Sequence, residues 1–151
     1  MKFWIAGKAH PNTDGSYKKL TEFSQNDDFT KEEVDKFDMI GKPIHIFHNE
    51  KLIAGKIISQ WKGYGGDYHI FGYLDLDTVA GRFGKNLIEK KLALDLSLSH
   101  EVKLFQNSLS GEITSKKQIP FEVSLVQEAR MDTLSCKVYY SKLEGKYFFK
   151  F

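Results

Sequence analysis

The chain has 151 residues, of which 41% are hydrophobic and 28% are charged. A chain of this size fits one globular domain with a substantial core, so we expect residues 1–151 to form a single domain. The 22 basic and 20 acidic residues are spread along the sequence and give a formal net charge of +2, which argues against nucleic acid as a direct partner.

Cysteine content and hydropathy indicate in which cellular compartment the protein is expected. The single cysteine, Cys136, excludes an internal disulfide and offers no spacing for a zinc site, which points to a reducing compartment. No apolar run reaches the length of about 18 residues that a membrane span needs, and the first residues lack the apolar core of a signal peptide. We therefore expect a soluble, intracellular protein with no membrane partner, no metal and no cofactor.

Short runs rich in aromatic and β-branched residues alternate with turn residues along the chain, which is typical of a sandwich or barrel. The expected strands are residues 2–9, 43–47, 52–61, 68–76, 92–99, 121–126 and 135–140. Hairpin loops are expected at 48–51 and 63–67, so neighbouring strands should pair antiparallel. The sequence predicts a mainly β (α+β) fold, an antiparallel barrel of about seven strands with one or two flanking helices.

Two helices are expected between these strands. Thr30 and Glu33 form a capping box that opens a short first helix. Asp77 or Thr78 can cap a longer second helix. Its apolar positions recur at helical spacing and are expected to pack on the core: Val79, Phe83, Leu87 and Ile88. Residues 103–118 are polar, and we expect them to form an exposed, mobile loop.

Three segments place polar side chains where chemistry could occur. Strict alternation puts Asp95, Ser97 and Ser99 on one face of a strand, and Glu122 on the polar face of a later one. A half-buried strand with a solvated outer side gives the same patterns. His48 lies where a strand meets a hairpin, and an imidazole can take a proton from a serine hydroxyl that is otherwise too weak an acid to attack a peptide bond.

Together these segments resemble the capsid-maturation protease superfamily, which comprises the herpesvirus assemblins and the tailed-phage prohead proteases. The family's catalytic-histidine hairpin is similar to GKPIHIFH at residues 41–48 followed by AGKI at 54–57. Its nucleophile strand, in which the first serine reacts, is similar to LSLS at 96–99. The prohead-protease motif that carries the third catalytic residue is similar to EVSLV at 122–126, and the first strand of the family is similar to FWIAG at 3–7.

The resemblance implies a serine endopeptidase with Ser97 as nucleophile, His48 as general base and Glu122 as the third catalytic residue. Assemblins carry a second histidine at that third place, but this chain has no histidine beyond residue 100, and Glu122 lies at a spacing from Ser97 similar to that in the family. Arg130 matches an assemblin arginine that helps to form the oxyanion hole. Met131 replaces the second arginine of the assemblin pair.

Other residues compete for these roles. Ser99 is the rival nucleophile because it shares the strand face of Ser97. His100 is a rival base, but adjacent strand residues point to opposite faces, so we expect it to face away from Ser99. By the same alternation, His45 should point away from the face of His48.

The resemblance also implies a setting for the activity. Scaffold and capsid precursor proteins would be the substrates, the chain would cleave its own precursor, and the reaction would take place inside an assembling viral capsid in the host cell. A homo-oligomer is left open. The alternative function is a non-catalytic β-barrel that serves as a structural or scaffold-binding viral protein. A third interpretation is a nucleic-acid-binding barrel that stacks bases on Trp4, Trp61, Tyr64 and Tyr68.

Overall fold

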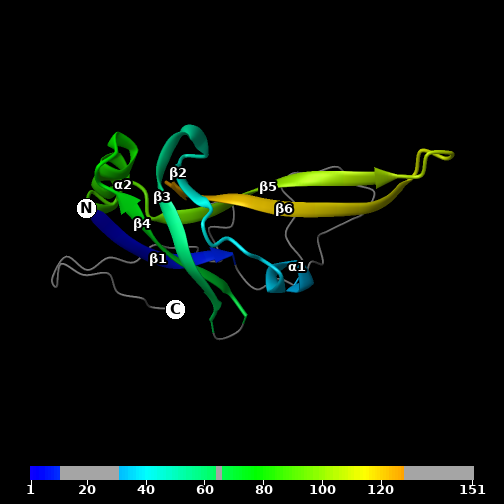
Figure 1. Ribbon diagram of the computed structural model, residues 1–151, viewed down its shortest axis with the longest axis horizontal. Coiled ribbons are helices and arrows are strands. Elements are labelled where there is room, and N and C mark those ends of the chain that lie inside the picture. The colour runs from blue at the N-terminus through cyan, green and yellow to red at the C-terminus, as the bar shows by residue number, and fades with distance from the viewer. Residues whose placement is uncertain (11–30, 64–65, 128–151) are drawn as a thin grey trace.

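The computed structural model describes residues 1–10, 31–63 and 66–127, and in these ranges six strands and two helices are present. In chain order they are β1 (Lys2–His10), α1 (Lys31–Asp35), β2 (Pro43–Ile46), β3 (Asn49–Lys62), β4 (Tyr68–Asp75), α2 (Val79–Glu89), β5 (Asp95–Gln106) and β6 (Ile113–Val126) (Figure 1). Predictions for Thr30, Arg130, Cys136 and the strand 135–140 fall outside the described residues. The longer helix, α2, has 11 residues, and neither described helix has the length and apolar character to cross a membrane.

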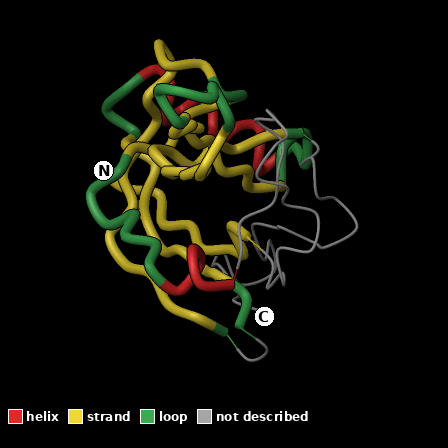
Figure 2. The backbone as a smooth tube through the Cα atoms, turned by 90° about the vertical axis from the view of Figure 1, so that its right-hand side faces the viewer, coloured by secondary structure: helices red, strands yellow, loops and turns green. Residues whose placement is uncertain are grey.

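The six described strands form one curled sheet with the order β1-β4-β3-β2-β6-β5. The sheet bends into a half-barrel that is open on one side in Figure 2. This confirms the predicted mainly β fold with flanking helices. One pairing differs from the expected antiparallel arrangement, because β2 runs parallel to β6, with Ile44 opposite Val123 and Ile46 opposite Leu125. The parallel pair brings the end of β2 beside the polar residues of β6.

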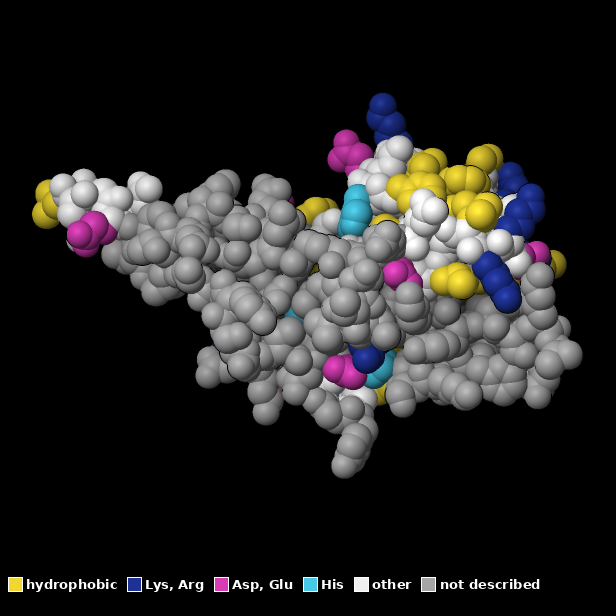
Figure 3. Space-filling model, turned by 180° about the vertical axis from the view of Figure 1, so that it is seen from behind, with side chains coloured by type: hydrophobic (Ala, Val, Ile, Leu, Met, Phe, Trp, Pro, Cys, Tyr) yellow, Lys and Arg dark blue, Asp and Glu magenta, His cyan; other side chains and the backbone are white. Residues whose placement is uncertain are grey.

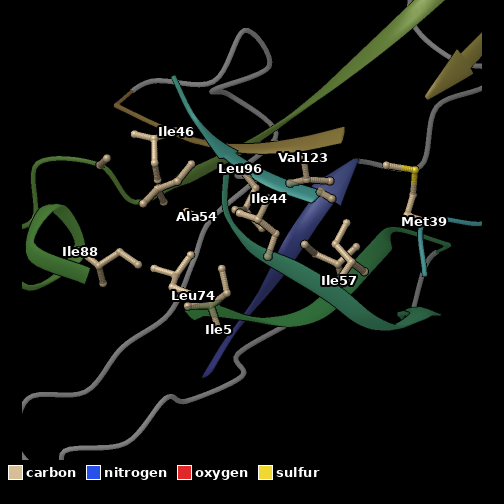
Figure 4. Packing of buried hydrophobic residues seen from close by; sticks show 14 of the residues in the cluster. Ile5, Met39, Ile44, Ile46, Ala54, Ile57, Leu74, Ile88, Leu96 and Val123 are labelled. Atoms are coloured by element: carbon tan, nitrogen blue, oxygen red, sulfur yellow. The ribbon is translucent and has the colours of Figure 1, made fainter. Parts of the chain in front are cut away.

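The concave side of the sheet holds the core. Aliphatic side chains from all six strands and from α2 meet there, including Ile5, Ile44, Ala54, Leu74, Ile88, Leu96 and Val123 (Figure 4). Each fully buried leucine, isoleucine or valine contributes about 1.5–3 kcal/mol relative to an exposed position. Because Leu96 is anchored in this core, strand alternation turns Ser97 to the opposite side of β5.

The second helix begins where the sequence predicts. Thr78 is its N-cap, and its hydroxyl oxygen accepts a hydrogen bond from the backbone N–H of Gly81 at 2.9 Å. Leu87 and Ile88 are buried against the core, as expected.

The prediction that Val79 and Phe83 pack on the core is wrong. Val79 is 73% exposed and Phe83 is 41% exposed. The helix instead packs through its small residues, because a Cβ on Gly84 would lie 3.0 Å from the terminal methyl carbons of both Ile46 and Leu74. Because the glycine face of the helix lies against the sheet, Val79 and Phe83 lie on the exposed side of the helix.

Replacing Gly81 by Ala should lower the free energy of unfolding by about 1–3 kcal/mol, because the new Cβ would overlap the backbone carbonyl of Asp75, which cannot move aside easily. Urea unfolding measures this change. Val79→Ala, an exposed position on the same helix, is the control and should shift stability by no more than about 0.5 kcal/mol. Equal midpoints for the two variants would contradict the tight contact.

The β5–β6 hairpin corrects the expected loop at 103–118. The two strands pair without interruption by a loop from Asp95↔Val126 to Gln106↔Ile113, and the ribbon extends well beyond the rest of the sheet (Figure 1). The turn at 107–112 is closed by the backbone N–H of Asn107, which donates to the carbonyl of Glu112 at 2.8 Å, and the Asn107 side-chain oxygen accepts a hydrogen bond from the Leu109 N–H at 2.8 Å. Backbone pairing in a hairpin does not require apolar side chains, so the polar composition did not reveal it.

The hairpin loop predicted at 63–67 is confirmed, since the backbone N–H of Gly63 donates to the carbonyl of Asp67 at 2.9 Å. Two of the aromatic residues considered for base stacking, Tyr68 and Trp61, contact other side chains, and Tyr64 lies outside the described residues. Tyr68 is 2% exposed and donates its hydroxyl to Gln60 at 2.6 Å, so it is not available to stack on a base. Trp61 stacks on His69.

Candidate active site

A two-residue turn, Phe47–His48, joins β2 to β3 and presents His48. Ile46 pairs with Asn49 across it, so the strand predicted to reach residue 47 ends one residue earlier and the loop predicted at 48–51 is shorter. Both turn residues have left-handed backbone angles, with φ of 53° for Phe47 and 56° for His48. Glycine, asparagine and aspartate usually fill such turns, and another residue costs about 1–2 kcal/mol at each position.

Strand β6 holds this unfavourable turn in place. The backbone N–H of Phe47 donates to the carbonyl of Leu125 at 3.0 Å. The backbone N–H of His48 donates to the hydroxyl oxygen of Ser124, also at 3.0 Å. The turn is therefore fixed to the strand that carries Glu122, which lies two residues before Ser124.

Ser97 reaches the same place from β5. The register of β5 against β6 sets Ser97 opposite Ser124 and Ser99 opposite Glu122. The hydroxyl oxygen of Ser97 lies 3.0 Å from Nε2 of His48, although the two residues are 49 positions apart. Both side chains remain partly exposed, so a substrate can approach them.

Glu122 of β6 contacts His48 on the side of the imidazole ring away from Ser97. Its side chain is 1% exposed, and Oε1 lies 2.7 Å from Nδ1 of His48. Its other oxygen accepts a hydrogen bond from the Ser124 hydroxyl at 2.8 Å. Burial opposes ionisation of this carboxyl, but hydrogen bonds from His48, Ser99 and Ser124 outweigh it and hold the pKa of Glu122 below its usual value.

The ionised carboxylate sets the tautomer of His48. Because a carboxylate only accepts hydrogen bonds, Nδ1 must carry the proton that it donates to Glu122, and Nε2 is left with a lone pair that faces Ser97. Ser99 lies 2.7 Å from Nδ1, the protonated nitrogen. The geometry therefore places Ser97 at the basic nitrogen of the imidazole and Ser99 at the other one.

His45 corrects a further expectation. Instead of pointing away, its Nδ1 lies 3.7 Å from the second oxygen of Glu122, and the side chain is 9% exposed. Register shifts on both sides of His45 in the β2–β3 pair break the strict alternation on which the prediction was based. The separation exceeds a hydrogen bond, so His45 is a neighbour of the carboxylate rather than a direct partner.

Ser124 was missed as a functional residue. Alternation places it on the polar face of β6 with Glu122, but nothing in the sequence shows that this face is covered by the Phe47–His48 turn. In the structure Ser124 is fully buried. Its position two residues after Glu122 on the same strand face is the sequence signal that could have identified it, whereas its place opposite Ser97 is set by the sheet register.

Apolar surface lies directly beside His48. Phe47 is 45% exposed and Phe83 of α2 is 41% exposed, and their rings meet edge to face with centroids 6.2 Å apart. Exposed hydrophobic side chains also gather at the end of the molecule away from the β5–β6 ribbon in Figure 3. The site is therefore an exposed hydroxyl–imidazole pair with a buried carboxylate beneath it and aromatic surface next to it.

The chain matches no model of a known protein family, and no curated protein has a detectably similar sequence. Among the described residues, no three histidine, cysteine, aspartate or glutamate side chains are grouped so that they could hold a metal ion. The inference of function therefore starts from the hydrogen-bonded group of Ser97, His48 and Glu122.

Proposed function

We propose that the protein is a serine endopeptidase in which Ser97 is the nucleophile, His48 the general base and Glu122 the carboxylate that orients the base. One observation carries the proposal. A continuous chain of contacts links the Ser97 hydroxyl to Nε2 of His48 at 3.0 Å and Nδ1 of His48 to Glu122 at 2.7 Å. A nucleophile, a base and a group that orients the base within hydrogen-bond reach are the recognised geometry of an activated serine.

In the proposed reaction, Ser97 transfers its proton to Nε2 of His48 as its oxygen attacks the scissile carbonyl carbon. Glu122 stabilises the imidazolium that forms, and His48 then gives the proton to the departing amine. The resulting acyl-enzyme on Ser97 is hydrolysed by water, with His48 again acting as the base. Proton transfer by a positioned group contributes roughly 10²–10⁴-fold to the rate.

The proposed substrates are scaffold and capsid precursor proteins inside an assembling viral capsid, together with the enzyme's own precursor. The support is the resemblance of LSLS at 96–99 and EVSLV at 122–126 to motifs of assemblins and prohead proteases. Confinement in a capsid would keep enzyme and substrate at high local concentration, so a slow enzyme would suffice. A homo-oligomeric state belongs to the same proposal.

Labelling with a fluorophosphonate probe, followed by mass spectrometry of the modified residue, tests the proposal. We expect modification at Ser97 that disappears in Ser97→Ala and His48→Ala and persists in Ser99→Ala. Long incubation in a kosmotropic salt allows for a slowly reacting serine. If the folded protein is modified at neither serine under these conditions, the non-catalytic barrel that binds scaffold becomes the better interpretation.

Arg130, which lies outside the described residues, is proposed to help form the oxyanion hole. Arg130→Ala should lower kcat by about 10²–10³-fold with a smaller effect on KM, because a cation facing the oxyanion acts in the transition state. Arg82→Ala is the matched control, since among the described residues the Arg82 side chain donates to a backbone carbonyl on the surface, that of Leu76. Peptide hydrolysis kinetics measure both variants, and equal kcat values would remove Arg130 from the mechanism.

A further inference from the structure

One buried hydroxyl contacts both the base and the carboxylate of the proposed site. Ser124 Oγ donates to Glu122 Oε2 at 2.8 Å and accepts from the backbone N–H of His48 at 3.0 Å. A serine hydroxyl has one donor and two acceptor lone pairs, so both hydrogen bonds form at the same time. Ser124 is fully buried, which strengthens both interactions by excluding water.

The turn that carries His48 depends on such an anchor. Its two residues adopt left-handed backbone angles that neither side chain favours. The Phe47 anchor is a backbone carbonyl, that of Leu125, which any residue at that position would supply. The parallel pairing of β2 with β6 ends at Ile46, so the N–H of His48 finds a side-chain acceptor in place of a strand carbonyl.

The carboxylate has a similar requirement. Oε1 of Glu122 faces Nδ1 of His48 while the Ser124 hydroxyl donates to its other oxygen, so Ser124 opposes rotation of the carboxylate away from the imidazole. His45 stands 3.7 Å from the same oxygen, too far to replace the hydroxyl. The Ser99 hydroxyl lies 2.7 Å from Nδ1 of His48 and helps to lower the pKa of Glu122, but among the described residues it has no hydrogen bond to the backbone of His48.

We propose that Ser124 is a positioning residue, a single hydroxyl that sets the backbone of the base and the orientation of the carboxylate together. The inference rests on the proposed function, because such positioning matters to catalysis only if Ser97, His48 and Glu122 react as described. It goes beyond that function by assigning the site a fourth residue, whose hydroxyl is hydrogen-bonded among the described residues to His48 and Glu122 rather than to the Ser97 hydroxyl.

Ser124→Ala and Ser99→Ala form a matched pair for the test. Each removes one hydroxyl that lowers the pKa of Glu122, but only Ser124→Ala also removes the acceptor of the His48 N–H. Carbon-13 NMR of Glu122 should show its titration moving to higher pH in both variants, because the charged form loses a donor. Amide hydrogen exchange at His48 should accelerate at least about tenfold in Ser124→Ala alone, as expected when a buried hydrogen bond is lost.

Kinetics supply the second readout. In Ser124→Ala, kcat should fall by about 10- to 100-fold with KM nearly unchanged, because a displaced base and carboxylate act on the transition state rather than on substrate binding. Ser124→Cys, which keeps the volume but donates weakly, should show the same changes to a similar extent and serves if the alanine variant does not fold.

The outcomes separate the two proposals. An unchanged Glu122 titration and an unchanged His48 amide exchange in a folded Ser124 variant overturn the role of Ser124, whatever the activity. Absence of labelling at Ser97 in the wild type overturns the protease, while the NMR readouts still report whether Ser124 holds His48 and Glu122. If neither variant folds, rapid exchange of the His48 amide in the wild type overturns the inference and slow exchange supports it.

Discussion

Ser97→Ala is expected to lower kcat for peptide hydrolysis by on the order of 10⁶-fold, as in serine proteases that lose the nucleophile. The reason is that no other hydroxyl lies at Nε2 of His48, since Ser99 is placed at Nδ1 among the described contacts. His48→Ala should cost about as much, and the double variant should be no worse than either single variant because the two residues act as a unit. Steady-state kinetics on a peptide substrate measure all three.

Ser99→Ala is the control for this prediction, because it removes a hydroxyl from the same strand face. It should keep most of the activity and lose only the contribution of one hydrogen bond to Glu122. The reverse result, with Ser99→Ala inactive and Ser97→Ala active, would assign the nucleophile to Ser99 and contradict the tautomer that the carboxylate imposes on His48.

Glu122→Gln is expected to lower kcat by about 10⁴-fold while the protein stays folded. An amide can donate to Nδ1 and so favour the tautomer in which Nε2 carries the proton and cannot accept one from Ser97. Nitrogen-15 NMR of the His48 ring reports that tautomer directly. Glu112→Gln, the same substitution on the exposed turn of the β5–β6 ribbon, should leave kcat and the His48 signals unchanged.

The same carboxylate predicts how stability depends on pH. The pKa of Glu122 is lower in the folded protein than its ordinary value of 4.5, so the folded chain holds the charged form more strongly than the unfolded chain does. Its stabilising contribution is complete above pH 4.5 and is lost as the pH falls through the lower, folded pKa. Urea unfolding between neutral and acidic pH should therefore show a steeper loss of stability for the wild type than for Glu122→Gln.

Within the site, backbone strain lies in the turn that carries His48, and the carboxylate of Glu122 and the hydroxyl of Ser124 are buried. The left-handed turn aims an exposed imidazole at the serine, and its unfavourable backbone is compensated by two hydrogen bonds to β6. The carboxylate is hidden under the turn, where three donors keep it charged despite its burial. Strand β6 thus positions both the exposed His48 imidazole and the buried Glu122 carboxylate.

Much of this could be predicted from the sequence. Alternation along 93–100 and 120–126 established which strand faces are polar, since a strand anchored by leucines and valines must turn its other residues away. The cap at Thr78 followed from local hydrogen-bonding chemistry that needs no distant partner. The resemblance of LSLS at 96–99 and EVSLV at 122–126 to capsid-maturation protease motifs predicts roles for Ser97 and Glu122, and the hairpin motif at 41–48 does so for His48.

Tertiary structure alone decided how those segments meet. The parallel pairing of β2 with β6 and the register shifts around His45 depend on contacts between segments far apart in the chain, which local patterns do not encode. They bring His45 to the carboxylate and bury Ser124 under the turn. The exposed position of Phe83 likewise follows from how closely Gly84 lets the helix approach the sheet. Periodicity in a sequence reports which faces are apolar, whereas the partner that covers a polar face is set by long-range packing.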